Sequence, residues 1–245
     1  MAIEVFNRIE KKYLITEDVY GKFFDKIIPY MEMDAFCKDG KFYSINNIYF
    51  DTENNDLIRT SIDKPAYKEK LRLRSYGVPE FNDIVFLEIK KKYNGIVNKR
   101  RTLLKLNQAY DFLFDGIMPS EGDYLNAQVL KELKFFMEFY NPVAKLFLAY
   151  DRVAMFGKDD ENLRITADRN IRTRRDDLRL EDGDYGDKLL QDGQVLIKIK
   201  TASSFPVWLV DILTELDMKG TSFSKYGTEY RQFMDNTLQK RGAIC

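Results

Sequence analysis

The stretch YKEKLRLRSYG, residues 67–77, contains the pattern from which the predicted architecture follows. If it forms a β-strand, alternate side chains share a face, so Leu71 and Leu73 point to one side of the sheet. The other side then carries cations spaced about 7 Å apart, namely Lys68, Lys70, Arg72 and Arg74. Such a face is either the solvated side of an antiparallel sheet or a surface that binds a polyanion.

The composition limits the kind of anion site that this chain can have. With 245 residues, 44% of them hydrophobic, the chain is long enough to bury one substantial core or two small ones. Its 39 basic and 39 acidic residues give a net charge of zero, which argues against a sequence-blind nucleic-acid binder or a membrane-surface binder. Any anion site must therefore be a local concentration of cations.

Residue types that are missing from the sequence exclude several chemistries. There is no histidine, so histidine bases, histidine triads and histidine metal ligands are excluded. The two cysteines, Cys37 and Cys245, make neither a zinc site nor a disulfide framework. A bound metal would be a hard cation such as Mg²⁺ or Mn²⁺, held by oxygen atoms.

The chain shows no targeting or membrane-spanning pattern. Its first residues, MAIEVFNRIEKK, lack an apolar signal core, and no apolar run reaches the roughly 20 residues that span a bilayer. We therefore expect a cytoplasmic protein with no transmembrane segment in this chain. Because repeats, low-complexity tracts and linkers are absent, residues 1–245 are expected to form a single domain.

Most of the chain is predicted to form strands, with a few helices between them. Strands are predicted where apolar and polar residues alternate, at 4–15, 42–50, 67–76, 84–92, 96–105, 145–156, 163–169 and 194–201. Helices are predicted where apolar residues recur at helical spacing, at 16–31 with Thr16 as N-cap, 107–115, 124–140, 206–217 and 228–240. Tyr93, Asn94 and Gly95 are expected to join two strands as a hairpin, and the charge-rich segment 172–188 is expected to be a solvated loop.

The pattern of residues 67–77 recurs on the other predicted strands. Charged side chains share one face and apolar side chains the other, as with Glu10 and Lys12, Glu88 and Lys90, Lys99 and Arg101, and Lys198 and Lys200. Cations outnumber acids on these faces, although like charges placed side by side repel. An α+β fold accommodates this pattern, with a closed antiparallel β-barrel of about eight strands, a wet lumen, and helices packed on the outside. Such a lumen fits a linear chain of phosphates, whose oxygens suit arginine and lysine.

Several stretches together resemble a known family. They run in order along nearly the whole chain: RIEKKYLI at 8–15, NIYFDT at 47–52, YKEKLRLRSYG at 67–77, VFLEIKKK at 85–92, NKRR at 98–101, YDRVAMFG at 150–157, LRITADRNIR at 163–172, VLIKIK at 195–200, FPVWL at 205–209 and FSKYG at 223–227. In these stretches the sequence resembles the polyphosphate polymerase domain of the vacuolar transporter chaperone (VTC) type, within the triphosphate tunnel metalloenzyme or CYTH superfamily.

The resemblance implies a tunnel of antiparallel strands whose basic interior binds the triphosphate of ATP and the growing inorganic polyphosphate. By position in the motifs, it implies catalytic roles for Arg72, Arg74, Lys200, Ser224 and Lys225. The same residues are expected to bind phosphate together with Lys12, Arg59, Lys70, Lys90, Lys99, Arg101, Arg152, Arg164 and Lys198. Catalysis would then consist of positioning the phosphates and neutralising their charge.

One position departs from the family pattern. Where the family has the metal-binding glutamate of an LxEIK motif, this sequence has Lys198 in VLIKIK, which removes an oxygen ligand and adds a repelling charge. Glu10 and Glu88 remain as candidate ligands for Mn²⁺ or Mg²⁺, together with phosphate oxygens. The alternative is that both acids pair with lysine and arginine on neighbouring strands.

Three functions remain open from the sequence. The first is an ATP-dependent polyphosphate polymerase. The second is a triphosphatase, in which water replaces the phosphate chain, but related hydrolases typically carry an ExExK strand and RIEKK keeps only Glu10. The third is a non-catalytic module that binds polyphosphate or triphosphate, which Lys198 favours. The metal, the oligomeric state, the product length and recruitment by a membrane partner stay open.

Overall fold

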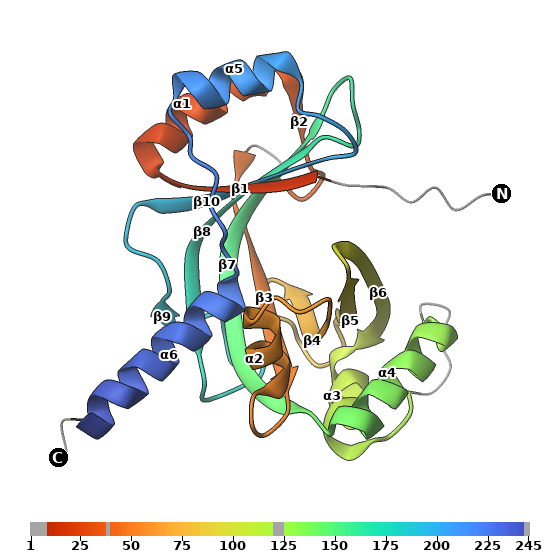
Figure 1. Ribbon diagram of the computed structural model, residues 1–245. Coiled ribbons are helices and arrows are strands. Elements are labelled where there is room, and N and C mark those ends of the chain that lie inside the picture. Colours follow the sequence, from red (N-terminus) through yellow and green to blue (C-terminus); the bar gives the residue numbers. More distant parts are fainter. Residues whose placement is uncertain (1–8, 38–39, 120–124, 243–245) are drawn as a thin grey trace. The chain divides into compact units, whose positions relative to one another are not determined.

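The computed structural model describes residues 9–37, 40–119 and 125–242, and Figure 1 shows the elements that they form. The strands are β1 (Ile9–Thr16), β2 (Met31–Met33), β3 (Tyr43–Asp51), β4 (Tyr67–Tyr76), β5 (Ile84–Tyr93), β6 (Ile96–Lys105), β7 (Val143–Gly157), β8 (Arg164–Arg174), β9 (Asp187–Lys188) and β10 (Gln194–Thr201). The helices are α1 (Glu17–Ile27), α2 (Asp56–Ile62), α3 (Leu106–Asp115), α4 (Ala127–Tyr140), α5 (Val207–Glu215) and α6 (Lys225–Gly242), with a 3-10 turn at Ile28–Tyr30.

The predicted elements are present, with a few differences in their limits. Residues 4–8 of the first predicted strand lie outside the described residues. The helix expected at 16–31 ends at Ile27, because Pro29 has no N–H to donate and cannot continue an α-helix. The remainder of that segment forms the 3-10 turn and the short strand β2.

The strands form one ten-stranded sheet, which confirms the predicted α+β class. Its main path runs β1-β10-β8-β7-β3-β4-β5-β6, with β2 paired to β7 and β9 paired to β8. The β1/β10, β10/β8, β3/β4, β4/β5 and β5/β6 pairs are antiparallel. The path has two ends, β1 and β6, so within the described residues its hydrogen bonds do not close the ring that the predicted barrel would have.

The chain divides into two compact units, each assembled from separate segments. Unit 1 comprises residues 1–43, 150–171 and 190–223, and unit 2 comprises 44–149, 172–189 and 224–245. Strands β3, β7 and β8 contribute residues to both units. The expected single domain over residues 1–245 remains a prediction.

Unit 1 has a core between strands β1, β8 and β10 and helices α1 and α5, which lie side by side in Figure 1. Thr16 ends β1 and caps α1, because its hydroxyl accepts the N–H of Val19 (3.4 Å). Phe23 and Ile27 recur on one side of α1 and are fully buried. The strands contribute alternate residues to this core, namely Tyr13, Ile15, Ile165, Ala167, Val195, Ile197 and Ile199. The residues between them therefore point to the opposite face.

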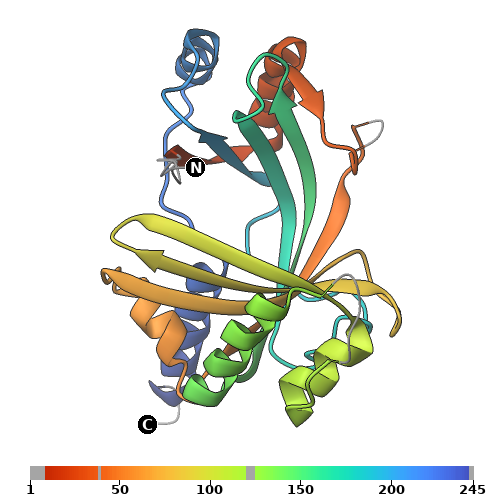
Figure 2. The same ribbon diagram turned by 90° about the vertical axis from the view of Figure 1, so that its right-hand side faces the viewer.

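Unit 2 is organised in the same way around β4, β5 and β6, which Figure 2 shows with the yellow β5–β6 hairpin beside β4. The predicted hairpin is present, but Tyr93 belongs to β5 and pairs with Ile96, so only Asn94 and Gly95 form the turn. Both adopt positive φ angles, 43° and 89°, as a two-residue hairpin turn requires. Helices α3 and α4 bury Leu106 and Leu133 against the apolar face of the strands, which includes Leu71, Leu73, Val85, Leu87, Ile89 and Leu104. The expected packing of helices against the apolar strand faces is confirmed in each unit.

The segment 172–188 was expected to be a solvated loop, and the structure confirms this only for residues 175–186, because Arg172–Arg174 complete β8 and Asp187–Lys188 form β9. The loop is also tied down from within. The guanidinium of Arg174 lies between the rings of Phe147 (3.5 Å) and Tyr185 (4.2 Å). It also donates hydrogen bonds to the backbone carbonyls of Asp177, Arg179, Gly183 and Tyr185. The charged side chain of Arg174 therefore stabilises the conformation of this segment. The pattern of charges in the sequence does not reveal this role.

Candidate functional site

The predicted phosphate-binding residues of unit 2 share the face of the sheet opposite its apolar core. We call these six cations, together with the acid Glu88, the unit 2 cluster. The cations are Lys70, Arg72, Arg74, Lys90, Lys99 and Arg101. Strand register brings them together, because Arg72 lies opposite Glu88, Glu88 opposite Arg101, and Lys90 opposite both Lys70 and Lys99. The alternation seen in residues 67–77 thus continues across three strands.

Glu88 is the acid at the centre of the unit 2 cluster, and its side chain is only 2% exposed. Its carboxylate accepts a hydrogen bond from Arg72 Nε (2.7 Å) and forms ion pairs with Arg72 Nη2 (2.6 Å) and with Lys99. Burial alone would raise the pKa of Glu88, but Arg72, Arg74 and Lys99 outweigh burial and lower it to about 2. Glu88 is therefore ionised at neutral pH and holds these cations in place.

Strand β3 fixes the two arginines of β4 from the other side. Arg72 Nη1 donates to the hydroxyl of Tyr49 (3.3 Å), and Arg74 Nε donates to Asn47 Oδ1 (2.9 Å). Asn47 is itself anchored, since its amide donates to the carbonyl of Leu148 (2.8 Å). Two guanidinium groups are thus preorganised next to each other, which suits them to bind phosphate oxygens.

Ser224 and Lys225 lie at the start of α6, where a buried carboxylate holds the helix. Asp51 accepts the backbone N–H groups of Leu57 (2.8 Å) and Ile58 (2.9 Å) at the start of α2. It also accepts the hydroxyl of Tyr226 (3.2 Å), the residue after Lys225. The hydroxyl of Ser224 caps α6 by accepting the N–H of Gly227 (3.3 Å). Asp51 thereby fixes the backbone that carries Lys225.

The remaining predicted residues of unit 2 differ in how closely they join this group. Lys70 Nζ lies 5.8 Å from the centre of the Tyr226 ring, and Tyr226 packs on Tyr49 (4.9 Å), so Lys70 is connected to both the cluster and α6. Arg101 lies over the ring of Phe86 (5.0 Å). Arg59 is exposed on α2, so its place among the phosphate-binding residues remains a prediction.

Unit 1 contains a second group on the face opposite its core. We call it the unit 1 grid: Glu10, Lys12, Arg164, Thr166, Lys198 and Lys200. In strand register it forms two rows, one of Glu10, Lys200 and Arg164 and the other of Lys12, Lys198 and Thr166. Lys12 also donates to the carbonyl of Phe223 (2.8 Å).

Glu10 neutralises part of the positive charge of the unit 1 grid. Its two oxygens lie 3.4 Å from Lys12 Nζ and 3.2 Å from Lys200 Nζ. Burial would raise the pKa of Glu10, but Lys198, Lys200 and Lys12 lower it to about 2. The grid therefore holds an ionised carboxylate among several ammonium groups.

Arg152, predicted to contact phosphate, forms a buried ion pair with Asp168. Its guanidinium donates to both oxygens of Asp168 (2.6 and 2.8 Å), and both side chains are almost fully buried. Burial would lower the pKa of Arg152, but Asp168 raises it. This bidentate pair links β7 to β8, and Asp168 lies on the same face of β8 as Arg164 and Thr166. The contact of Arg152 with phosphate remains a prediction.

The acids present do not fit a divalent metal site. Within the described ranges, no three Asp, Glu, Cys or His side chains lie close enough together to hold a metal ion. Glu10 and Glu88 each accept from two or more cations of their own unit, as the alternative reading of the sequence expected. A hard cation needs several oxygen ligands and would meet like charges at either carboxylate.

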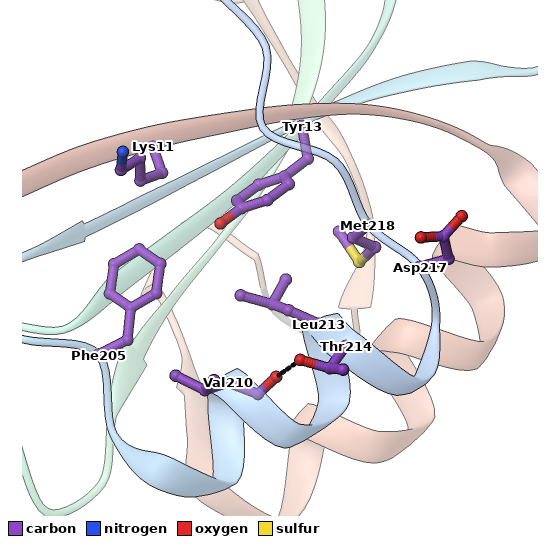
Figure 3. A pocket seen from close by; sticks show the side chains of 8 residues that line it. All are labelled: Lys11, Tyr13, Phe205, Val210, Leu213, Thr214, Asp217 and Met218. Atoms are coloured by element: carbon purple, nitrogen blue, oxygen red, sulfur yellow. Dashed lines mark hydrogen bonds between the residues drawn. The ribbon is translucent and has the colours of Figure 1, made fainter.

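A cavity of about 390 Å³ lies on the apolar side of β1, away from Glu10 and Lys12, and Figure 3 shows its lining. Its lining includes the apolar or aromatic side chains of Tyr13, Phe205, Val210, Leu213 and Met218. Two of its polar groups have partners: Thr214 donates to the carbonyl of Val210 (2.8 Å), and Asp217 pairs with Lys219 (3.1 Å). The cavity therefore does not resemble an anion site.

Asp51, Tyr226, Thr166 and Asp168 were not predicted as site residues. A signal existed for Asp51, because it follows an apolar strand and precedes a short helix, where a carboxylate can accept helix N–H groups. No comparable signal marked Tyr226, since its role depends on contacts between α6 and β3 that are distant in sequence.

Among the helices that the structure describes, none has both the length and the apolar character needed to cross a membrane.

No curated protein was found to match the chain. Among solved structures, a candidate adenylate cyclase from Bacillus halodurans is 15% identical over 89% of this chain and 93% of its own, with a TM-score of 0.55. A candidate adenylyl cyclase from Hippeastrum, described as having a dominant triphosphatase activity, is 16% identical over 89% of this chain and 93% of its own, with a TM-score of 0.49.

The first of these likenesses concerns the fold alone, while the family match concerns the sequence itself. The profile of the VTC domain matches residues 7–234, which is most of the chain and includes both the unit 1 grid and the unit 2 cluster. The resemblance read from the motifs is thereby confirmed. The chain belongs to the VTC domain family.

Proposed function

We propose that this protein is an ATP-dependent polyphosphate polymerase, which transfers the γ-phosphate of ATP to the end of an inorganic polyphosphate chain. Family membership supports a role with polyphosphate or triphosphate. The observation that carries the proposal further is the pair Arg72 and Arg74, two guanidinium groups fixed by Tyr49, Asn47 and Glu88 on one strand face.

The reaction requires little covalent chemistry from the protein. A terminal oxygen of the polyphosphate attacks the γ-phosphorus of ATP in line, forming one P–O bond. The P–O bond to the β–γ bridging oxygen breaks, and ADP leaves with that electron pair. In unit 2, Arg72 and Arg74 would neutralise charge on the phosphoryl oxygens, and Lys225 would do so from the start of α6. In unit 1, Lys200 would have the same role toward the phosphates bound there. Asp51 would position Lys225 through Tyr226.

A second candidate function is a non-catalytic module that binds polyphosphate or triphosphate. Lys198 favours it, because a third ammonium beside Lys12 and Lys200 strengthens anion binding without adding any group that transfers a phosphoryl. In this case the grid and the cluster bind phosphate as above, but ATP is not turned over.

Incubation of the purified protein with ATP and Mn²⁺, followed by separation of the products on a gel, tests the proposal. A polymerase gives long polyphosphate ladders, a triphosphatase releases phosphate, and a binding module leaves ATP unchanged. Arg72→Met should abolish the ladders. Arg100→Met is the matched control, because Arg100 lies on the opposite face of the sheet and pairs with Glu132 (2.6 Å). Absence of ladders from the folded wild-type protein would refute polymerase activity.

A further inference from the structure

The unit 1 grid differs in chemistry from a site built for a divalent cation. Three ammonium groups surround its one carboxylate: Lys12 and Lys200 pair with the oxygens of Glu10, and Lys198 adds its charge from the middle strand. An oxygen ligand that is already neutralised in this way attracts a metal ion weakly, and the ammonium groups repel the ion.

The grid also contains polar atoms that lack partners. Thr166 is 1% exposed, yet its hydroxyl has no hydrogen-bond partner within the part of the chain that the structure describes. The same holds for Nε of Arg164, two residues away on the same face of β8, although its guanidinium reaches Asp34 through Nη2 (3.4 Å). Buried polar groups without partners cost free energy, so such atoms indicate a ligand that supplies acceptors.

Both atoms can donate hydrogen bonds, and both lie beside the ammonium groups. Thr166 is directly opposite Lys198 in the β8/β10 pair, and Arg164 is directly opposite Lys200. A phosphate chain carries acceptor oxygens and negative charge at the same time. It would therefore satisfy the unpartnered donors and neutralise the lysines together.

We propose that unit 1 binds the phosphates of its substrate without a divalent metal, with the ammonium of Lys198 supplying charge that a metal ion would otherwise supply and the hydroxyl of Thr166 donating to a phosphate oxygen. This inference rests on the proposed function, since it requires that the protein binds phosphate chains. It adds that binding is independent of metal, and it assigns Thr166 to the site.

Calorimetric titration with sodium tripolyphosphate, in EDTA and in Mn²⁺, tests both parts on the full chain. The wild-type protein should bind in EDTA with an affinity close to that in Mn²⁺. Lys198→Gln should bind about 10- to 100-fold more weakly in EDTA, because one charge-assisted hydrogen bond is lost. Thr166→Val, which keeps the side-chain shape, should bind about 3- to 10-fold more weakly. Lys198→Glu should recover binding when Mn²⁺ is added, because the introduced carboxylate is an oxygen ligand.

Lys11→Glu is the matched control, since Lys11 is adjacent to Lys12 but lies on the opposite side of β1, beside the cavity of Figure 3. It should leave the affinity unchanged, and a circular dichroism spectrum shows that each variant is folded. Binding by the wild-type protein only when Mn²⁺ is present would overturn this inference and leave the proposed function standing. Unchanged affinity in Thr166→Val would remove Thr166 from the site. If the folded wild-type protein binds no tripolyphosphate in either buffer, the proposed function fails, and this inference fails with it.

Discussion

Replacement of Glu88 by glutamine tests whether this acid is an ion-pair partner or a metal ligand. The substitution keeps the shape of a side chain that is 2% exposed, but it removes the charge that Arg72, Arg74 and Lys99 face. Those cations lower the pKa of Glu88 from 4.5 to about 2. At about 1.4 kcal/mol per pKa unit, the folded protein favours the ionised carboxylate by about 3 kcal/mol, and Glu88→Gln should lose stability of that order at pH 7.

The sign of the pH dependence follows from the lowered pKa. Ionised Glu88 contributes its full stabilisation above pH 4.5, and this contribution is lost as the pH falls toward about 2. Urea denaturation of the wild-type protein and Glu88→Gln should therefore show a stability gap that is large at pH 7 and shrinks below pH 4.5. Tripolyphosphate should bind the variant at least as tightly as the wild type, because Arg72 and Lys99 lose a competing anion.

The matched control is Glu138→Gln, because Glu138 is exposed and forms a surface ion pair with Lys134 at 3.8 Å. Such a surface pair contributes about 0.3–0.5 kcal/mol at most, so this variant should unfold almost as the wild type does. A gap for Glu88→Gln that is equally small at pH 7, or that does not change between pH 7 and pH 3, would refute the ion-pair role. Loss of a metal-dependent heat of binding in Glu88→Gln would support the metal-ligand role instead.

Three further substitutions test individual contacts. Tyr226→Phe removes the hydroxyl that donates to Asp51 and should lower the free energy of unfolding by about 1–2 kcal/mol and polyphosphate synthesis more than tenfold; normal synthesis would argue against a positioning role. Arg152→Leu leaves Asp168 buried without its partner and should cost about 3–5 kcal/mol in urea denaturation, whereas adding Asp168→Leu should recover most of it; a double variant no more stable than the single one would contradict this. Arg174→Lys loses the planar fork that binds four backbone carbonyls, so limited proteolysis should cut faster within residues 175–186, and an unchanged cleavage rate would count against this anchor.

The alternation of side chains along the strands made most of the fold predictable. Leu71 and Leu73 face the core while Arg72 and Arg74 face away from it, as residues 67–77 alone indicate, and the same rule holds on β1, β5 and β10. The alternation of side chains did not predict the short helix α2 or the folding of segment 172–188. Both depend on one buried side chain, Asp51 or Arg174, that forms hydrogen bonds with several backbone groups, and alternation carries no information about such bonds.

The sequence predicted on which face of its strand each candidate site residue lies, but not its hydrogen-bond or ion-pair partners. Alternation places Arg72, Lys99 and Lys200 on the charged faces, where the structure has them. It could not show that Arg152 pairs with a buried aspartate, or that Glu88, Tyr49 and Asn47 hold Arg72 and Arg74. Alternation also did not mark Thr166 as a site residue, because threonine is common in strands. Only the structure shows that its hydroxyl is buried without a hydrogen-bond partner among the described residues.

A crystal structure of the protein with bound tripolyphosphate would show whether the charged strand faces are phosphate-binding surfaces. We expect phosphate oxygens within hydrogen-bonding distance of Arg72 and Arg74 in unit 2 and of Lys200 in unit 1. If tripolyphosphate is seen only on other surfaces, with these side chains contacting solvent and their present acidic partners, the cations of the strand faces are structural and the proposed function is wrong.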